Sequence, residues 1–130
     1  MGIPNAVAGE KARAISRLMA INDAEARALA LRRFAGTLRG DSSLKKPAAA
    51  MKAASVGQRN AARRADRLRT AFDRAKAAMD AEGADGIRFA ARHREANVAL
   101  KVWTRAWGAY QCAYLATISA AREVTAALTA

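Results

Sequence analysis

The chain has little of the chemistry that catalysis or metal binding requires. It contains one histidine and one cysteine, His93 and Cys112, which are 19 positions apart. On one helix that separation is about 28 Å, so the two side chains cannot form a nucleophile–base pair within a chain. Zinc needs a cluster of such ligands, and no calcium loop or glycine-rich phosphate loop is present. We therefore expect a protein that is not an enzyme and that uses no metal or cofactor.

Residues that disfavour helices are also scarce. The chain has two prolines and few β-branched residues, whereas 37 of its 130 residues are alanine. Alanine has the highest helix propensity and allows neighbouring helices to approach closely. A chain of this length fits one domain. These features predict an all-α fold in which residues 1–130 form a single helical domain.

Long apolar runs are missing as well. The longest uncharged stretch, residues 106–121, has 16 residues and includes glycine, glutamine, threonine and serine. A membrane-spanning helix needs roughly 20 predominantly apolar residues. The N-terminal stretch MGIPNAVAGEKARAI lacks the basic-then-apolar order of a secretory signal, and a lone cysteine does not indicate an oxidising compartment. We expect a protein of the cytoplasm or of a virion interior, neither secreted nor membrane-spanning.

Turn-forming residues divide the chain into four expected helices, over about 5–21, 22–38, 47–82 and 86–128. The clearest loop is GDSSLKKP, which ends at Pro47, a residue suited to the start of a helix. Because a short turn joins the last two helices, they should lie antiparallel. The predicted architecture is an N-terminal helix pair (1–40), a loop (41–46) and a long, coiled-coil-like helical hairpin (47–130) with its turn near 83–86.

The expected helix ends carry recognisable capping residues. Asn22 can cap the second helix, and Glu25 stands three residues later, where it completes a capping box. Gly83 can take the left-handed conformation that ends the third helix. Asp85 can cap the fourth.

The last two helices show a heptad pattern, in which apolar residues alternate spacings of three and four. Sustained spacing of this kind predicts a packed seam between helices. Folding about Ala84 pairs positions whose numbers sum to 168, which places Phe72 opposite Ala96 and Ala65 opposite Trp103. Bulky residues then face alanines, as close packing favours. The core seam is predicted to contain Leu68, Phe72, Met79, Phe89, Leu100, Trp103, Trp107, Tyr110 and Tyr114.

Three polar residues, Gln58, His93 and Thr117, interrupt this seam. The simplest interpretation of His93 is a seam residue that faces Ala75. The fourth helix also has a second apolar face. We expect the N-terminal helix pair to cover that face, which consists of Val98, Val102, Cys112, Leu115 and Ile118.

The charge is strongly biased towards basic residues. The formal net charge is +12, and residues 45–69 contain eight basic residues and one acid. Arg59, Arg63 and Arg67 recur every four residues and therefore share one helical stripe. Such a stripe can bind a phosphate backbone without sequence preference. The alternative is that arginine, a good helix former, merely occupies exposed helix positions. The candidate nucleic-acid-binding residues are Lys45, Lys46, Lys52, Arg59, Arg63, Arg64, Arg67, Arg88 and Arg92.

Acidic residues gather around the expected turn of the hairpin, at Asp73, Asp80, Glu82 and Asp85. One hypothesis is that they dock on a basic surface, including that of another copy of the chain. The other is that they are solvated acids that offset nearby arginines.

Two short stretches resemble known proteins. KKPAAAMKAA, residues 45–54, resembles the Lys-Pro-Ala repeats of bacterial histone-like tails, and it occurs once. IPNAVAG followed by an alanine-rich helix resembles small internal virion proteins of tailed phages. Neither stretch assigns the chain to a family.

The leading hypothesis is a non-enzymatic helical protein that acts near nucleic acid within a larger assembly, such as a virion interior or a nucleoid complex. Its partners would be nucleic acid phosphates or an acidic protein surface, together with other protein subunits. One alternative is a small modulator, such as a phage-encoded inhibitor, that docks on a host protein. Another is a membrane-associated protein of the kind ejected with phage DNA, although a membrane is the less favoured partner.

Overall fold

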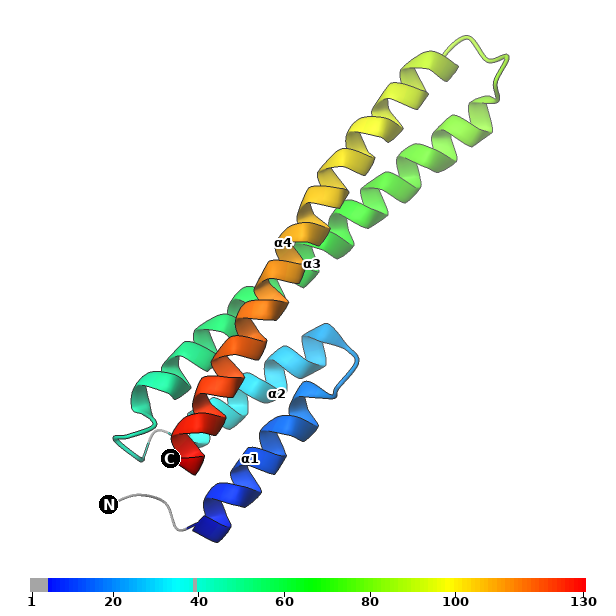
Figure 1. Ribbon diagram of the computed structural model, residues 1–130. Helices are drawn as coiled ribbons and strands as arrows, with labels where there is room; N and C mark the ends of the chain where they lie inside the picture. The colour runs from blue at the N-terminus through cyan, green and yellow to red at the C-terminus, as the bar shows by residue number, and fades with distance from the viewer. Residues whose placement is uncertain (1–4, 39) are drawn as a thin grey trace. The chain divides into compact units, whose positions relative to one another are not determined.

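The computed structural model of the protein describes residues 5–38 and 40–130 (Figure 1). This part of the chain contains no strand. Its elements are four helices, which confirms the predicted all-α class. The first four residues of the stretch 1–15, which is expected to hold no secretory signal, lie outside the described residues. The helices are α1 (Asn5–Met19), α2 (Ala24–Thr37), α3 (Lys45–Glu82) and α4 (Phe89–Thr129).

The N-cap of α2 is Asp23 rather than Asn22. Asp23 has an extended backbone, and its Oδ2 atom accepts a hydrogen bond of 2.8 Å from the backbone N–H of Ala26. Both residue types are good caps, so composition alone does not distinguish them. The prediction was wrong by one position because the chain enters the helix one residue later than expected.

The link between α3 and α4 is longer than predicted. Gly83 has φ +76°, which confirms the left-handed residue after the end of α3. Asp85 is not the cap of α4, however, because α4 begins at Phe89. The carboxylate of Glu82 instead accepts a hydrogen bond of 3.0 Å from the backbone N–H of Arg88. An acid at the end of α3 thus satisfies a donor at the beginning of α4.

The loop before α3 is held by Asp41. Its Oδ1 atom accepts hydrogen bonds from the backbone N–H and the hydroxyl of Ser43, at 2.9 and 2.6 Å. These two donors stabilise the charged carboxylate and hold the pKa of Asp41 below its ordinary value. The helix starts at Lys45, two residues before Pro47. Proline is tolerated there because a first-turn N–H has no partner within the helix.

The chain gathers into two compact units. The core unit contains residues 1–60 and 111–130, and the two-helix unit contains residues 61–110. In the core unit, α1 and α2 lie against the first part of α3 and the last part of α4 (Figure 1). The N-terminal helix pair therefore packs on the hairpin as predicted. The most deeply buried apolar side chains are Leu31, Leu38, Leu44, Met51 and Val124.

The two-helix unit consists of residues 61–82 of α3 and residues 89–110 of α4. Its contact is lined by alanines, since Ala65, Ala96 and Ala106 are the buried residues of this segment. The rings of Phe72 and Trp103 stack beside them, with centroids 5.7 Å apart. Alanine contacts allow two helices to approach closely. The larger side chains therefore lie towards the edges of the contact.

Most of the predicted seam residues are half-buried, but two of them lie outside the seam. Leu68, Phe72, Met79, Phe89, Trp103, Tyr110 and Tyr114 are partly buried. Leu100 and Trp107 are 39% and 48% exposed. The neighbouring alanines, Ala99 and Ala106, turn inwards instead. The seam prediction was wrong for Leu100 and Trp107 because the heptad pattern also fits residues one position earlier, and the smaller side chains permit the closer contact.

The register between α3 and α4 differs from the prediction. Phe72 stacks on Trp103, the side chain of Gln58 meets that of Thr117, and the Thr117 hydroxyl donates to the Ala54 carbonyl at 3.3 Å. The numbers in these pairs sum to 175, 175 and 171, all above the expected 168. The longer link, with α3 ending at Glu82 and α4 beginning at Phe89, accommodates the shift.

The second apolar face of α4 is largely uncovered. Val98 and Val102 in the two-helix unit are exposed, and so are Cys112 and Leu115 in the core unit. Ile118 is the exception, since it lies in a groove with Ile15 of α1. The expectation that the N-terminal helices cover this face was therefore wrong for four of its five residues.

None of the helices formed by residues 5–38 and 40–130 combines the length and the apolar character needed to cross a bilayer.

Candidate polyanion-binding surface

Four of the candidate basic residues belong to the core unit, at the beginning of α3. Lys45, Lys52 and Arg59 follow one another at intervals of seven residues, so they lie on one face of the helix. Lys45 and Lys46 are exposed, and Lys52 and Arg59 are half-buried. This row of basic residues differs from the predicted stripe of Arg59, Arg63 and Arg67, and it lies on the side of α3 next to α2.

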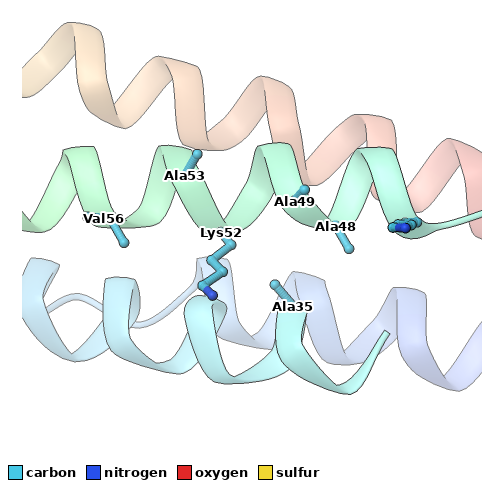
Figure 2. Close-up of a pocket in the computed structure, with 7 residues that line it drawn as sticks. Ala35, Ala48, Ala49, Lys52, Ala53 and Val56 are labelled. Carbon is cyan, nitrogen blue, oxygen red and sulfur yellow. The ribbon is translucent and has the colours of Figure 1, made fainter. Parts of the chain in front are cut away.

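A groove with an apolar floor separates this part of α3 from α2 (Figure 2). Its volume is about 580 Å³, and alanines form most of its walls. Figure 2 shows Lys52 reaching from α3 towards α2, near Ala35. A lysine on such a wall places its apolar stem against the alanines and keeps its ammonium group in water. The ammonium groups of Lys45 and Lys52 can therefore contact an anion while their stems pack.

Arg59 forms an ion pair within the fold. Its Nε atom lies 3.5 Å from Oε1 of Glu25 on α2, and both side chains are partly exposed. An exposed pair of this kind contributes about 0–1 kcal/mol to stability. Arg59 thus has an intramolecular partner, and it is a weaker candidate for phosphate contact than the arginines that follow it.

The remaining candidates belong to the two-helix unit. Arg63, Arg64 and Arg67 are exposed on successive turns of α3. Within residues 5–38 and 40–130, no carboxylate forms an ion pair with Arg64 or Arg67. On α4, Arg92 is paired with Glu95 at 3.2 Å, and Arg88 is exposed. Arg64 and Arg67 therefore belong to the candidates without an ion-pair partner in this part of the chain, as do Lys45, Lys46, Lys52 and Arg88.

Sequence reasoning overlooked Arg69 as a candidate. Its guanidinium group lies over the ring of Trp103, 5.9 Å from the ring centroid, while the residue remains exposed. A guanidinium group on an aromatic face is held in place and keeps its N–H donors at the edge for an anion. The signal was available, because Arg69 is the last residue of the basic stretch that begins at Lys45.

A second overlooked residue is Arg27, which forms the centre of a buried polar cluster in the core unit. Arg27 is 5% exposed, and Gln58 and Thr117 are fully buried. The Gln58 amide is assigned the orientation that satisfies its neighbours, in which Nε2 donates to Thr117 Oγ1 at 3.0 Å and Oε1 accepts from Arg27 Nε and Nη2 at 3.1 and 2.8 Å. The Arg27 Nη1 atom donates to the Ile21 carbonyl at 2.8 Å, and the guanidinium group stacks on Tyr114 at 4.5 Å.

This cluster is structural in character. It joins α2, α3 and α4 through one buried guanidinium group whose donors are matched by acceptors. A buried charge is tolerated only when it is hydrogen-bonded in this way. Gln58 and Thr117, the two polar interruptions of the predicted seam, are therefore each other's partners.

The third polar interruption, His93, is exposed rather than in the seam. Its ring stacks on that of Phe89, and its Nδ1 atom lies 3.5 Å from Asn97 Nδ2. Cys112 is an exposed free thiol. In the described part of the chain, no group of three or more His, Cys, Asp or Glu side chains is placed to hold a metal ion.

The docking hypothesis for the acids near the turn stays a prediction. Asp73, Asp80 and Asp85 are exposed, and Glu82 binds the backbone of Arg88. The surface with a clear charge is therefore the basic one on α3.

No protein-family model, curated protein or solved structure matches this chain.

Proposed function

We propose that this protein is a non-enzymatic helical protein that binds the phosphate backbone of nucleic acid within a larger assembly, such as a virion interior or a nucleoid complex. The observation that carries the proposal is the exposed arginine turn of α3. Arg64 and Arg67 have no ion-pair partner in the described part of the chain, and Arg63 is exposed beside them. Arg69, two residues after Arg67, lies on another side of the helix. Arg63, Arg64 and Arg67 are the proposed phosphate-binding arginines.

The net charge of the chain supports this assignment. Twenty-three lysines and arginines against eleven acids give +12. Such an excess attracts polyanions and accelerates their association. The proposed contacts involve phosphates only, since nothing on this face resembles a reader of base edges. Binding should therefore be independent of sequence. It should also weaken steeply as the salt concentration rises, because the release of counterions then contributes less to the affinity.

The experiment is fluorescence anisotropy of labelled duplex and single-stranded DNA at several salt concentrations. The test variant is Arg64→Glu with Arg67→Glu. The matched control is Arg13→Glu with Arg17→Glu, two exposed arginines four residues apart on α1. Both variants change the net charge by the same amount, so they separate a local site from a general charge effect.

We expect the test variant to lose at least about tenfold in affinity and the magnitude of its salt slope to fall by roughly two. The control should keep most of its affinity. Circular dichroism should show unchanged helicity in both, because the replaced side chains are exposed. Equal losses of affinity in the two variants would show that DNA binding depends on the net charge and not on these arginines. Absence of DNA binding by the unaltered protein at low salt would refute the proposal and direct the search to a protein partner.

A further inference from the structure

The exposed face of α4 in the two-helix unit has a regular pattern of its own. Six residues between positions 91 and 109 alternate spacings of four and three, so they lie on one stripe. At about 100° per residue, this stripe is roughly a quarter turn from the face that packs on α3. Val98 and Val102 at its centre are 61% and 37% exposed. The stripe, which we call the outer stripe, consists of Ala91, Glu95, Val98, Val102, Arg105 and Ala109.

The outer stripe is complementary to itself when it is reversed. An antiparallel copy, aligned so that facing numbers sum to 200, places Val98 against Val102 of the other chain. In the same alignment Glu95 faces Arg105, and Ala91 faces Ala109. Each contact then occurs twice, as a two-fold axis requires. The stripe therefore presents apolar residues at its centre, opposite charges on either side and small residues at its ends.

We propose that the outer stripe is the contact through which two copies of this protein pair, with their α4 helices antiparallel. The small residues allow the helix axes to approach to the 8–10 Å typical of packed helices. The surface is already hollowed at Ala91, Glu95 and Val98, where a facing side chain can enter. The pairing removes the exposed valines from water, and this burial of apolar surface favours the dimer.

The charges select the antiparallel arrangement. In a parallel pair each residue faces its own copy, so Glu95 would meet Glu95 and Arg105 would meet Arg105, which is repulsive. In the antiparallel pair these become two ion pairs. Glu95 is also paired with Arg92 of its own helix at 3.2 Å, but that contact is exposed. Exposed pairs contribute little, so it does not prevent Glu95 from binding the other chain.

The pairing does not depend on nucleic acid. None of the six residues belongs to the proposed phosphate-binding arginines of α3. A dimer would nevertheless double the number of arginine turns in one particle, and binding through both would strengthen contact with a long polyanion.

Charge reversal tests the contact in full-length protein without nucleic acid. Sedimentation equilibrium of the unaltered chain, from micromolar to millimolar concentration, should show a reversible dimer. Glu95→Arg alone, or Arg105→Glu alone, should raise the dissociation constant at least about tenfold, because each places like charges opposite one another. The double variant with both changes restores opposite charges and should restore the dimer.

The matched control is Glu123→Arg, an exposed acid on α4 in the core unit. It changes the net charge as Glu95→Arg does, and it should leave the dimer intact. A chain that stays monomeric at millimolar concentration would overturn the proposal. So would a double variant that is no tighter than the single ones.

Disulfide cross-linking tests the register and needs no change of charge. In a Cys112→Ser background, a mixture of Val98→Cys and Val102→Cys chains should form a mixed disulfide under mild oxidation. Either variant alone should react much less, because like positions are offset by about 6 Å along the axis. Equal cross-linking in all three samples would contradict the alignment.

Discussion

Replacing Gln58 with leucine removes the acceptor that holds the buried guanidinium group of Arg27. Two Arg27 donors, Nε and Nη2, lose hydrogen bonds of 3.1 and 2.8 Å, while the Ile21 carbonyl and the Tyr114 ring remain. Hydrogen bonds to charged groups contribute about 1.5–3 kcal/mol each. The added apolar burial of leucine offsets roughly 1 kcal/mol. We therefore expect the free energy of unfolding to fall by about 2–5 kcal/mol.

Thermal and urea unfolding followed by circular dichroism measure this loss. For a chain of this size, 1 kcal/mol corresponds to about 4 °C, so Tm should fall by roughly 8–20 °C. Gln111→Leu is the matched control, because Gln111 is exposed on α4 in the same unit. Its effect should stay within about 0.5 kcal/mol.

A double-mutant cycle separates this cluster from general packing. Arg27→Met together with Gln58→Leu removes both the buried charge and its acceptor, so no polar atom of the pair is left uncompensated. The double variant should be more stable than the sum of the single changes implies, by at least about 1.5 kcal/mol. Thr117 keeps its own bond of 3.0 Å to the Ala113 carbonyl throughout. Additive losses, or a Gln58→Leu variant as stable as the unaltered protein, would refute the reasoning.

Three further predictions concern helix ends and the loop before α3. Gly83→Ala should lower the free energy of unfolding by about 1 kcal/mol, because φ is +76° at Gly83. Gly57→Ala should raise it by about the same amount, because Gly57 lies within α3 and has open space around it. Urea unfolding measures both changes, and changes of the same sign would contradict the left-handed conformation of Gly83. Asp23→Ala should cost about 1 kcal/mol and Asn22→Ala much less, as thermal melts should show; the reverse order would restore Asn22 as the cap. The pKa of Asp41 should lie below its ordinary value in an NMR titration. The contribution of the Asp41 carboxylate to stability is therefore complete above the unfolded-state pKa and is lost as pH falls through the lower folded-state pKa. An unshifted titration would rule out the Ser43 hydrogen bonds in solution.

The helices and their caps show how far sequence reasoning extends. Alanine content and turn residues predicted four helices and the left-handed Gly83, because these depend on local backbone preferences. The prediction of Asn22 rather than Asp23 as the N-cap of α2 was wrong. Both side chains can accept the same hydrogen bond, and only the path of the chain decides which residue caps the helix. Asp85 failed as a cap for a related reason, because Glu82 from the previous helix supplies the acceptor.

For the candidate surface, too, some features are visible in the sequence and others are not. The basic stretch of α3 is visible in the sequence, and its residues are on the surface. The sequence does not show that Arg59 has Glu25 as an ion-pair partner on another helix, or that Arg69 lies over Trp103. These contacts join residues more than 30 positions apart, so they depend on which helices become neighbours.

The sequence by itself determined the helical class, the antiparallel hairpin and the basic character of α3, since periodicity, propensity and charge are local properties. Only the tertiary structure decided the register of the hairpin. The heptad pattern is satisfied by more than one register, and the structure has contacts whose numbers sum to 171 and 175 rather than 168. Particular contacts break that equivalence: the stack of Phe72 on Trp103, and the meeting of Gln58 with Thr117. The structure also turned Ala106 inwards and left Trp107 at the edge, because two helices that touch through alanines pack closer than helices separated by indole rings.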